Sequence, residues 1–412
     1  MKYPEIKLGE VADIKGGKRL PKGDLLVEFD TGFPYIRAQD IKNGLITFKE
    51  PKFITSDLRQ KLKNYTVNKH DVCITIVGAY VGDVGIVPDH LSGANLTENA
   101  VKLTNFKNNF NSQYLKYALL SREAQEAMKK FGSGAAQDKL GIYKIKEIKI
   151  PNPPPEIQRK IAGILSAYDR LIENNTRRIE ILEEMARSIY REWFVNFRFP
   201  GHEQVQMVDS ELGLIPEGWE VKNLSEICEI IMGLSPKSEF YNENAEGLPL
   251  HQGVTNFGAW FPTDKVYTTT ITRLAQIGDI LFSVRAPVGR INIANKTIVI
   301  GRGICAIRSK TGKQNFVLQQ LKDKFYEDNL MGGGTIYPSV TKEEVQKIKM
   351  LVPLPEKILA FESQSLSVFR QIEVFLLKNI NLRQTRDLLL PRLISGEIDL
   401  ENLDINTGPI AA

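Results

Sequence analysis

Residues 156–195 read EIQRKIAGILSAYDRLIENNTRRIEILEEMARSIYREWFV, and this stretch decides the fold. A series of mainly apolar residues begins with Ile161, Leu165 and Tyr168 and continues to Trp193, with spacings of four and three residues in turn. This rhythm predicts one long helix with a coiled-coil seam along one side. For a single helix, an ordinary amphipathic stripe would explain the spacing at least as well.

The same seam returns two hundred residues later, which makes that simpler explanation improbable. Seven of the ten positions at this offset are apolar. The predicted seam residues are Ile161, Leu165, Tyr168, Ile172, Asn175, Ile179, Leu182 and Ile189, followed by Phe361, Val368, Ile372, Phe375, Asn379, Leu382, Leu389 and Leu393. Because a second globular domain must be threaded between the two helices, we expect them to pack antiparallel, with the globular domains at opposite ends.

Two polar residues, Asn175 and Asn379, fall on seam positions. A polar side chain in a seam can fix the register of a helix pair at some cost in stability. An orientation toward solvent at a loosely packed layer is the equal alternative.

The rest of the chain repeats as well. Strand-like runs, a shorter helix, a glycine turn at 132–134 or 332–334 and a proline-led helix entry occur twice in the same order, and Asp71 matches Asp279. In the first copy we expect the shorter helix over 112–131 and a strand at IKEIKI before the proline-led entry. We expect a mixed α/β (α+β) protein. Its predicted parts are a globular domain at 1–152, a long helix at 153–197, a linker at 198–218, a second globular domain at 219–352, a second long helix at 353–396 and a tail at 397–412.

Composition sets limits on the class of protein. The chain of 412 residues, 42% hydrophobic and 25% charged, is typical of a soluble protein with two or three domains. It has no apolar run of about eighteen residues and no signal-peptide core at its start, so we expect it in the cytoplasm. A formal net charge of +5 permits binding to nucleic acid without demanding it.

Neither the cysteines nor the histidines form a metal site. Cys73, Cys228 and Cys305 are far apart in apolar surroundings, as buried reduced thiols are. The four histidines lack the spacing of zinc ligands. We expect no structural metal.

Several passages together resemble the specificity subunits of type I restriction–modification systems along essentially the full length. They are KLGEVADIKGGKRLPKG, PYIRAQDI, IKEIKIPNPPPEIQRKIAGILSAYDRLIENN, MARSIYREWFV, SELGLIPEGWEVKNL, ILFSVRAPVGRINIA, GRGICAIRS and LLLPRLISGEI. The resemblance implies a subunit without catalysis of its own, whose two domains each read half of a bipartite DNA sequence. It further implies double-stranded DNA, two methyltransferase subunits and two ATP-driven restriction subunits as partners. S-adenosylmethionine, ATP and magnesium then belong to those partners and not to this chain.

One departure from the family pattern concerns the helix entries. The first reads Pro-Pro-Glu-Ile-Gln-Arg from Pro154, whereas the second, Leu-Pro-Glu-Lys-Ile-Leu from Leu354, lacks the Gln and the basic residue. The departure puts in doubt how symmetrically two methyltransferase copies are held. We expect such a docking face on the outer side of the first long helix, at Arg177, Arg178, Glu180, Glu183 and Glu184.

Catalytic motifs are incomplete. Asn152-Pro153-Pro154-Pro155 resembles the motif with which adenine methyltransferases hold a flipped base, but its last residue has no aromatic ring. The glycines at 132–134 and at 16–17 do not complete a nucleotide-binding loop, and Glu147 with Lys149 has no nearby acid that would complete a nuclease site. We therefore predict no catalytic residues, although a self-contained DNA methyltransferase or nuclease and a purely architectural coiled-coil scaffold are the alternatives.

Candidate DNA contacts are basic and amide side chains on loops, because these meet phosphates and base edges. In the first domain they are Lys15, Lys18, Arg19, Lys22, Arg37, Gln39 and Lys42. In the second they are Lys237, His251, Gln252, Asn256, Arg273, Arg285, Arg290 and Arg302. Arg285 and Arg302 could instead pair with Asp279 or another acid at the edge of the core. Trp260 and Phe261 could be either exposed or packed.

The candidate loops differ between the two domains, so we expect an asymmetric target. A helix of about 60 Å could hold two reading surfaces roughly one DNA turn, about 34 Å, apart. The DNA between the half-sites would be untouched.

Overall fold

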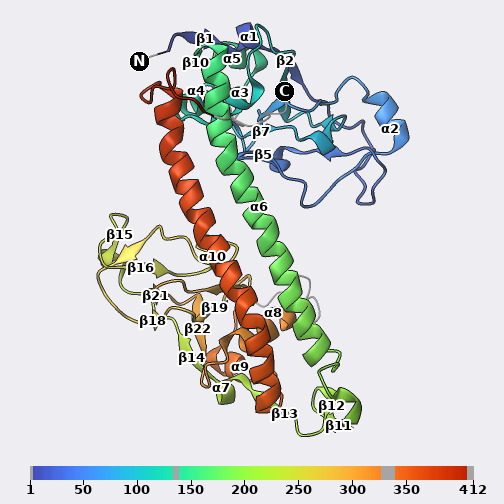
Figure 1. Cartoon of the computed structure of the whole chain (residues 1–412), viewed down its shortest axis with the longest axis vertical. Helices are drawn as coiled ribbons and strands as arrows, with labels where there is room; N and C mark the ends of the chain where they lie inside the picture. Colours follow the sequence, from blue (N-terminus) through green and yellow to red (C-terminus); the bar gives the residue numbers. More distant parts are fainter. Residues whose placement is uncertain (1–2, 133–138, 326–338, 406–412) are drawn as a thin grey trace. The chain divides into compact units, whose positions relative to one another are not determined.

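A computed structural model describes residues 3–132, 139–325 and 339–405, and the chain forms two compact units (Figure 1). Unit 1 consists of Met1–Asn175 with Leu377–Ala412, and unit 2 of Thr176–Leu376. The two longest helices, α6 (Pro155–Phe194) and α10 (Pro355–Ile394), each have 40 residues and contribute to both units. None of the helices in the described ranges has the length and apolar character that crossing a membrane requires.

Local sequence explains where both long helices begin and where α10 ends. Each opens on a proline followed by a glutamate, and proline suits the first helical position because its missing N–H would have no partner there. Past the end of α10, Gly396 adopts a φ of 77°, the left-handed conformation that commonly terminates helices. The start of each long helix and the end of α10 thus follow from local signals.

The helix pair is antiparallel within unit 1. Asp169 of α6 contacts Arg386 of α10, and six residues further along α6, Asn175 contacts Asn379. Residue numbers therefore decrease along α10 in the direction in which they increase along α6.

The helix pair is also antiparallel within unit 2. The Arg178 guanidinium lies 5.5 Å from the centre of the Phe375 ring, and the rings of Tyr190 and Phe361 lie 6.1 Å apart. The predicted mixed fold, with a repeated globular domain and two long antiparallel helices, is confirmed.

The predicted seam residues are all buried or half-buried. Ile161, Leu165, Ile172, Asn175, Ile179, Phe361, Val368, Ile372, Asn379 and Leu393 are buried, and Tyr168, Leu182, Ile189, Phe375, Leu382 and Leu389 are half-buried. Arg386, also at a seam position, is half-buried and forms an ion pair, which explains how the stripe tolerates a charge.

The globular part of unit 1 is built on a six-stranded sheet in the order β2-β9-β6-β7-β5-β4. Among the described strand pairs of this sheet, only β5 and β7 pair in parallel. The strands of unit 1 are β1 (Glu5–Lys7), β2 (Asp13–Gly16), β3 (Tyr35–Ile36), β4 (Ile41–Lys42), β5 (Gly44–Ile46), β6 (Val72–Thr75), β7 (Val84–Ile86), β8 (Asn95–Leu96), β9 (Ala100–Thr104) and β10 (Lys149–Pro151). Its shorter helices are α1 (Leu8–Val11), α2 (Ser56–Lys61), α3 (Ser112–Leu120), α4 (Arg122–Gly132) and α5 (Ile142–Lys146).

Unit 2 repeats the central part of this arrangement. Its four-stranded sheet has the order β14-β22-β19-β20, and a five-stranded sheet has the order β15-β17-β16-β21-β18. The strands are β11 (Met207–Ser210), β12 (Gly213–Pro216), β13 (Glu220–Asn223), β14 (Cys228–Met232), β15 (Tyr241–Asn242), β16 (Leu248–His251), β17 (Tyr267–Thr268), β18 (Leu274–Ala275), β19 (Ile280–Ser283), β20 (Ile291–Ile293), β21 (Ile298–Ile300), β22 (Ile304–Ser309) and β23 (Lys349–Val352). Its shorter helices are α7 (Leu224–Ile227), α8 (Gln314–Lys324) and α9 (Lys342–Gln346).

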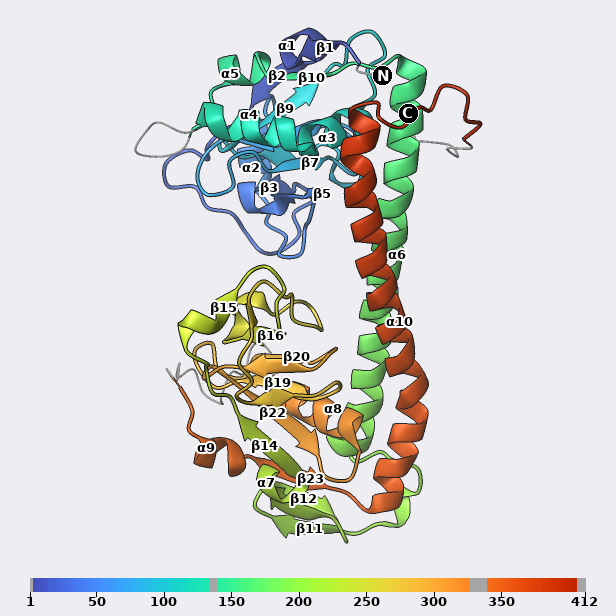
Figure 2. The same cartoon turned by 90° about the vertical axis from the view of Figure 1, so that its left-hand side faces the viewer.

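In each unit one helix joins the sheet to the helix pair: α3 in unit 1 and α8 in unit 2 (Figure 2). In unit 1, Tyr114 and Leu115 of α3 share one core with Val72 of β6 and Ile161 of α6. In unit 2, Val317 and Leu321 of α8 share a core with strand β19 and both long helices. The sheets are therefore anchored to the long helices through buried apolar side chains.

Three details differ from the sequence-based expectations. The single helix expected over 112–131 is divided into α3 and α4 at Ser121, and the strand-like IKEIKI contains the end of α5 before β10. The expected linker contains the hairpin β11–β12. The glycines 133–134 and 332–334 lie outside the described residues.

The linker also contributes to a core. Phe199 stacks on Trp219 with ring centroids 5.1 Å apart, and both belong to a buried cluster with Tyr190 and Phe361. Aromatic residues spaced irregularly along a chain give no periodic signal, so this packing could not be read from the sequence.

Candidate nucleic-acid interface

In each unit, a glycine allows a loop with basic residues to run close to the backbone of the segment that connects two strands. In unit 1, Gly17 N donates to Ala100 O, and a Cβ on Gly17 would overlap the carbonyl oxygen of Thr97. In unit 2, Gly233 N donates to Ile304 O, and a Cβ there would overlap the carbonyl of Gly301. Only glycine fits such an approach, so the two loops occupy equivalent places.

In unit 1 this loop forms the wall of a cleft of about 480 Å³. The cleft is lined by three predicted DNA contacts, Arg19, Arg37 and Gln39. It is also lined by Tyr80, Glu98 and Asn99, three residues that sequence reasoning did not single out. Residues 19 to 99, distant in sequence, are thus brought to one concave surface.

Arg37 has its guanidinium occupied within the protein. Its Nη2 lies 2.8 Å from Asp40 Oδ1 and donates to the carbonyl oxygen of Glu50 at 2.9 Å. Burial of this arginine alone would lower its pKa, but the hydrogen bond to Asp40 is the larger effect and raises the pKa. Arg37 therefore orders the loop that carries the exposed Gln39.

The remaining predicted contacts of unit 1 are exposed lysines. Lys15 lies on β2, Lys18 and Lys22 lie on the loop after it, and Lys42 lies on β4. None of these four lines the cleft. Their exposure leaves the ammonium groups accessible to phosphate.

Unit 2 exposes five of its predicted contacts: Lys237, Gln252, Arg273, Arg285 and Arg302. Asn256 and Arg290 are half-buried. His251 is only 1% exposed, and its Nε2 lies 3.0 Å from Asp264 Oδ1. The structure thus places His251 in the core, as a strand residue whose ring is covered, and does not offer it to a ligand.

The alternative pairing of Arg285 or Arg302 with Asp279 does not occur. Asp279 instead accepts two hydrogen bonds from Arg308, both of 2.7 Å. The equivalent acid of unit 1, Asp71, lies 3.6 Å from Lys102. This acid–base pair belongs to the repeated framework, so Arg285 and Arg302 remain available at the surface.

Trp260 is packed and not presented to solvent. Its Nε1 donates to Glu183 Oε1 at 2.6 Å, and its ring contacts Phe369. Lys322 lies 3.9 Å from the centre of the indole ring. Of the predicted docking face on α6, Glu183 is half-buried and engaged inside unit 2, whereas Arg177, Arg178, Glu180 and Glu184 are exposed, with Arg178 beside the Phe375 ring.

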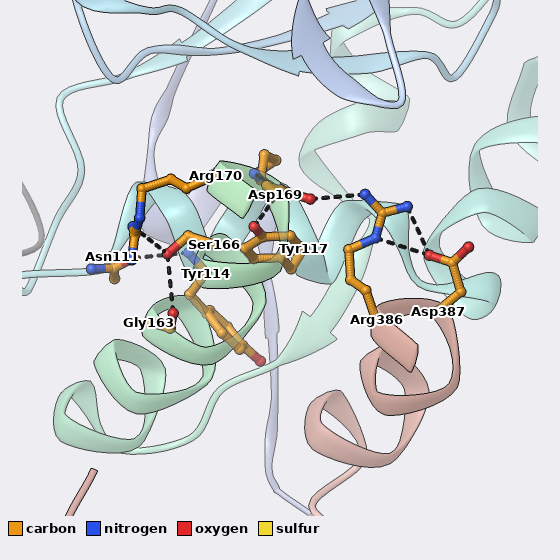
Figure 3. A network of polar contacts seen from close by, with 10 residues as sticks. Asn111, Tyr114, Tyr117, Gly163, Ser166, Asp169, Arg170, Arg386 and Asp387 are labelled. Atoms are coloured by element: carbon orange, nitrogen blue, oxygen red, sulfur yellow. Dashed lines mark hydrogen bonds and ion pairs between the residues drawn. The ribbon is translucent and has the colours of Figure 1, made fainter. Parts of the chain in front are cut away.

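A buried polar network stabilises the helix pair in unit 1 (Figure 3). Asp169 accepts hydrogen bonds from the Tyr117 hydroxyl, from Lys116 Nζ at 2.9 Å and from Arg386 Nη1 at 2.8 Å. Burial alone would raise the pKa of Asp169, but Lys116 and these hydrogen bonds hold it below its ordinary value. Asp169 is therefore ionised at neutral pH and ties α3 to both long helices.

A hydrogen bond at each long helix shows what replaces the glutamine that the second repeat lacks at its helix start. Gln158, 1% exposed, accepts from the backbone N–H of Asn111 at the start of α3 and donates to Pro153 O. In unit 2, Glu362 accepts from the backbone N–H of Phe316 at the start of α8. Both residues cap a helix, so the missing glutamine has an internal replacement.

The residues weighed for catalysis have structural roles. Asn152 accepts a hydrogen bond from Gln158 beside the start of α6. Burial raises the pKa of Cys228 and Cys305 to about 12 and that of Cys73 further, so these thiols stay protonated. Within the described ranges, no group of three or more His, Cys, Asp or Glu residues could hold a metal ion.

The repeated units match a known sequence family. Residues 2–184 and 216–367 match the family described as the type I restriction modification DNA specificity domain. The chain belongs to this family. The two matched segments correspond to the two copies of the globular domain, each with the first part of the long helix that follows it.

Relatives agree with this specificity-domain membership. A Methanocaldococcus jannaschii chain assigned as the MjaX specificity subunit of a type I restriction enzyme is 30% identical over 89% of this chain and 87% of its own length. The MjaIX specificity subunit of the same organism is 27% identical over 96% and 94%. A solved type I S subunit from M. genitalium, 17% identical, covers 96% of both chains with a TM-score of 0.57 and shows the same fold.

Proposed function

We propose that this chain directs a type I restriction–modification complex to its target, each unit reading one half of an asymmetric bipartite DNA sequence. Family membership supports the role of a specificity subunit. The cleft and the exposed basic loops support direct contact with DNA, since lysine and arginine meet phosphates and base edges.

One observation carries the two-half proposal: the units share a backbone frame but carry different side chains on it. Lys18 N and Leu234 N donate to equivalent carbonyl oxygens, so these two loop residues are equivalent. The next residue is Arg19 in unit 1 and Ser235 in unit 2. Sequence is read by such side chains. Two frames with different residues therefore favour two different half-sites.

The long helices are proposed to set the spacing between the half-sites and to dock methyltransferase subunits. A continuous helix of 40 residues is about 60 Å long at 1.5 Å per residue. The exposed residues Arg177, Glu180 and Glu184 of α6 are the proposed start of the docking face. Two methyltransferase and two restriction subunits are the proposed partners.

The proposal includes no catalysis by this chain. S-adenosylmethionine, ATP and magnesium are proposed to bind the partner subunits. The family resemblance supports this assignment of the cofactors, and Asn152 and the three cysteines are engaged or buried within the chain.

The test is to select DNA from a library of random duplexes with the full-length chain and to assay methyl transfer with and without a methyltransferase subunit. We expect a bipartite consensus, and transfer from S-adenosylmethionine only when that subunit is present. Transfer by the chain alone would support the rival enzyme. Absence of DNA affinity at low salt would support a scaffold.

A further inference from the structure

Glu98 of unit 1 and Arg302 of unit 2 occupy the same position in the two backbone frames. Each is the middle of three residues, Thr97–Asn99 between β8 and β9 and Gly301–Gly303 between β21 and β22. Thr97 N donates to Ile36 O as Gly301 N donates to His251 O, and these carbonyls end the parallel partner strands.

The other end of each connection is held in the same way. Ile76 N donates to Asn99 O at 2.7 Å, and Val284 N donates to Gly303 O at 3.0 Å. Because both ends match, the residues between them are equivalent one by one. The acidic residue Glu98 of unit 1 therefore occupies the position that the basic residue Arg302 occupies in unit 2.

The Glu98 carboxylate is held at the cleft of unit 1. Arg19 Nε donates to its Oε1 at 2.9 Å, Thr97 Oγ1 donates to its Oε2 at 3.1 Å, and 30% of the side chain is exposed. Burial would raise the pKa of Glu98, but these hydrogen bonds lower it below its ordinary value. An ionised carboxylate offers only hydrogen-bond acceptors.

Arg302 offers only donors. It is exposed, and its backbone N–H donates to Ser235 Oγ, which in turn donates to Gln252 Oε1 at 3.2 Å. No carboxylate among the residues that the structure describes lies within ion-pairing distance of its guanidinium. The main chain of Arg302 is thus fixed while its side chain is accessible.

The charge reversal indicates which part of DNA meets this position. A phosphate would be repelled by a carboxylate, so a position that carries Glu98 in one unit is unsuited to the DNA backbone. Base edges in the major groove present both donors and acceptors, and glutamate and arginine each have a base partner there.

We propose that Glu98 and Arg302 are specificity-determining residues of their units, Glu98 accepting a hydrogen bond from an exocyclic amino group, cytosine N4 or adenine N6, and Arg302 donating to guanine O6 and N7. The inference rests on the proposed function, because it assigns a base-reading role to one position in each half-site reader.

The test compares the wild-type full-length chain with E98Q, R302Q and the control E126Q, each selecting from a library of random duplexes. Glu126 is 63% exposed on α4, where it pairs with Arg122, so its variant loses the same charge away from the cleft. We expect E98Q to change base preference at one position of one half-site by at least about tenfold, because glutamine replaces an acceptor-only side chain with one that also donates. R302Q should do so in the other half-site, and E126Q should leave both unchanged.

Base analogues separate the two amino groups. N4-methylcytosine or N6-methyladenine at the affected position places a methyl group in the major groove, and only one of them should abolish the difference between wild type and E98Q. At the R302Q position, 7-deazaguanine should weaken the wild type and not the variant.

Two failures are distinguishable. If the wild type selects no bipartite sequence, the proposed function fails. If it does, but E98Q lowers affinity evenly for every sequence, Glu98 only holds Arg19 and the inference is overturned, as it is if E98Q and R302Q alter the same half-site. Melting temperatures near that of the wild type exclude misfolding as the cause.

Discussion

Asn175 Nδ2 donates a hydrogen bond of 3.0 Å to Asn379 Oδ1 inside the helix pair, where the two residues are 8% and 2% exposed. A buried polar pair in an apolar seam is satisfied only when the helices are in one register. Of the two sequence-based interpretations, the inward, paired orientation is the one observed.

Replacing one member of this pair should cost more than replacing both. Asn175→Leu leaves a buried amide without this partner, and we expect it to lower the free energy of unfolding by about 1–3 kcal/mol. The double replacement Asn175→Leu with Asn379→Leu should recover most of that loss, because two apolar side chains restore the seam. Denaturant unfolding of all three variants measures this, and a double variant less stable than both single ones would contradict it.

The network around Asp169 predicts a large loss of stability when its carboxylate is replaced by an amide. Asp169→Asn leaves Lys116, which is 2% exposed, without its ionic partner, and we expect a loss of about 3–5 kcal/mol. Asp387, which also pairs with Arg386 but is 62% exposed at its side chain, is the matched control. Asp387→Asn should cost less than about 1 kcal/mol. Equal losses in unfolding experiments would show that burial does not decide the effect.

Asp169 also predicts an acid-sensitive component of stability. Its pKa in the folded protein is lowered, so its contribution is complete above the ordinary aspartate pKa of about 3.9 and is lost as pH falls through the lower folded value. The melting temperature of the wild type should therefore fall more steeply below about pH 4 than that of Asp169→Asn. If the melting temperatures of the two proteins fall in parallel with pH, an ionised Asp169 is not the source of the acid sensitivity.

The two buried tryptophans should respond differently to replacement by phenylalanine. Trp260→Phe removes a hydrogen bond to the Glu183 carboxylate, and we expect a loss of about 1.5–3 kcal/mol. Trp219 is the control, since its Nε1 has no hydrogen-bond partner among the described residues. Trp219→Phe should cost less, and neither variant should change the selected DNA sequence. A changed sequence with Trp260→Phe would instead indicate a contact with DNA.

Lys18 is predicted to meet a phosphate. Lys18→Ala should weaken binding similarly for all sequences and reduce the slope of log affinity against log salt by about 0.9, the value for one phosphate contact. Lys149 on β10, exposed beside Glu5, is the control and should leave the slope unchanged. Titrations from low to moderate salt measure both slopes, and equal slopes for Lys18→Ala and wild type would exclude the contact.

The long helices could be predicted from sequence because a 4-3 rhythm and a proline at the helix start are local signals. The division of α3 from α4 at Ser121 depends on a side chain that turns back to Ala118 O, which no periodic pattern shows. Helix-forming residues on both sides concealed the break.

The candidate site was predicted only in part. Arg19 and Gln39 stood out as polar residues on loops, and both line the cleft. Glu98 did not, because its place depends on a hydrogen bond that it accepts from Arg19, 79 residues earlier in the chain. His251 carries a side chain suited to bases, but strand pairing buries it, and burial follows from tertiary packing alone.

The central claim is that each unit reads its own half of the target. The most direct measurement is the DNA sequence selected by the full-length chain after residues 13–104 are exchanged for the corresponding segment of a relative with a different target. We predict that one half-site changes while the other half-site and the number of base pairs between them stay the same. A change in both halves, or in neither, would contradict the account.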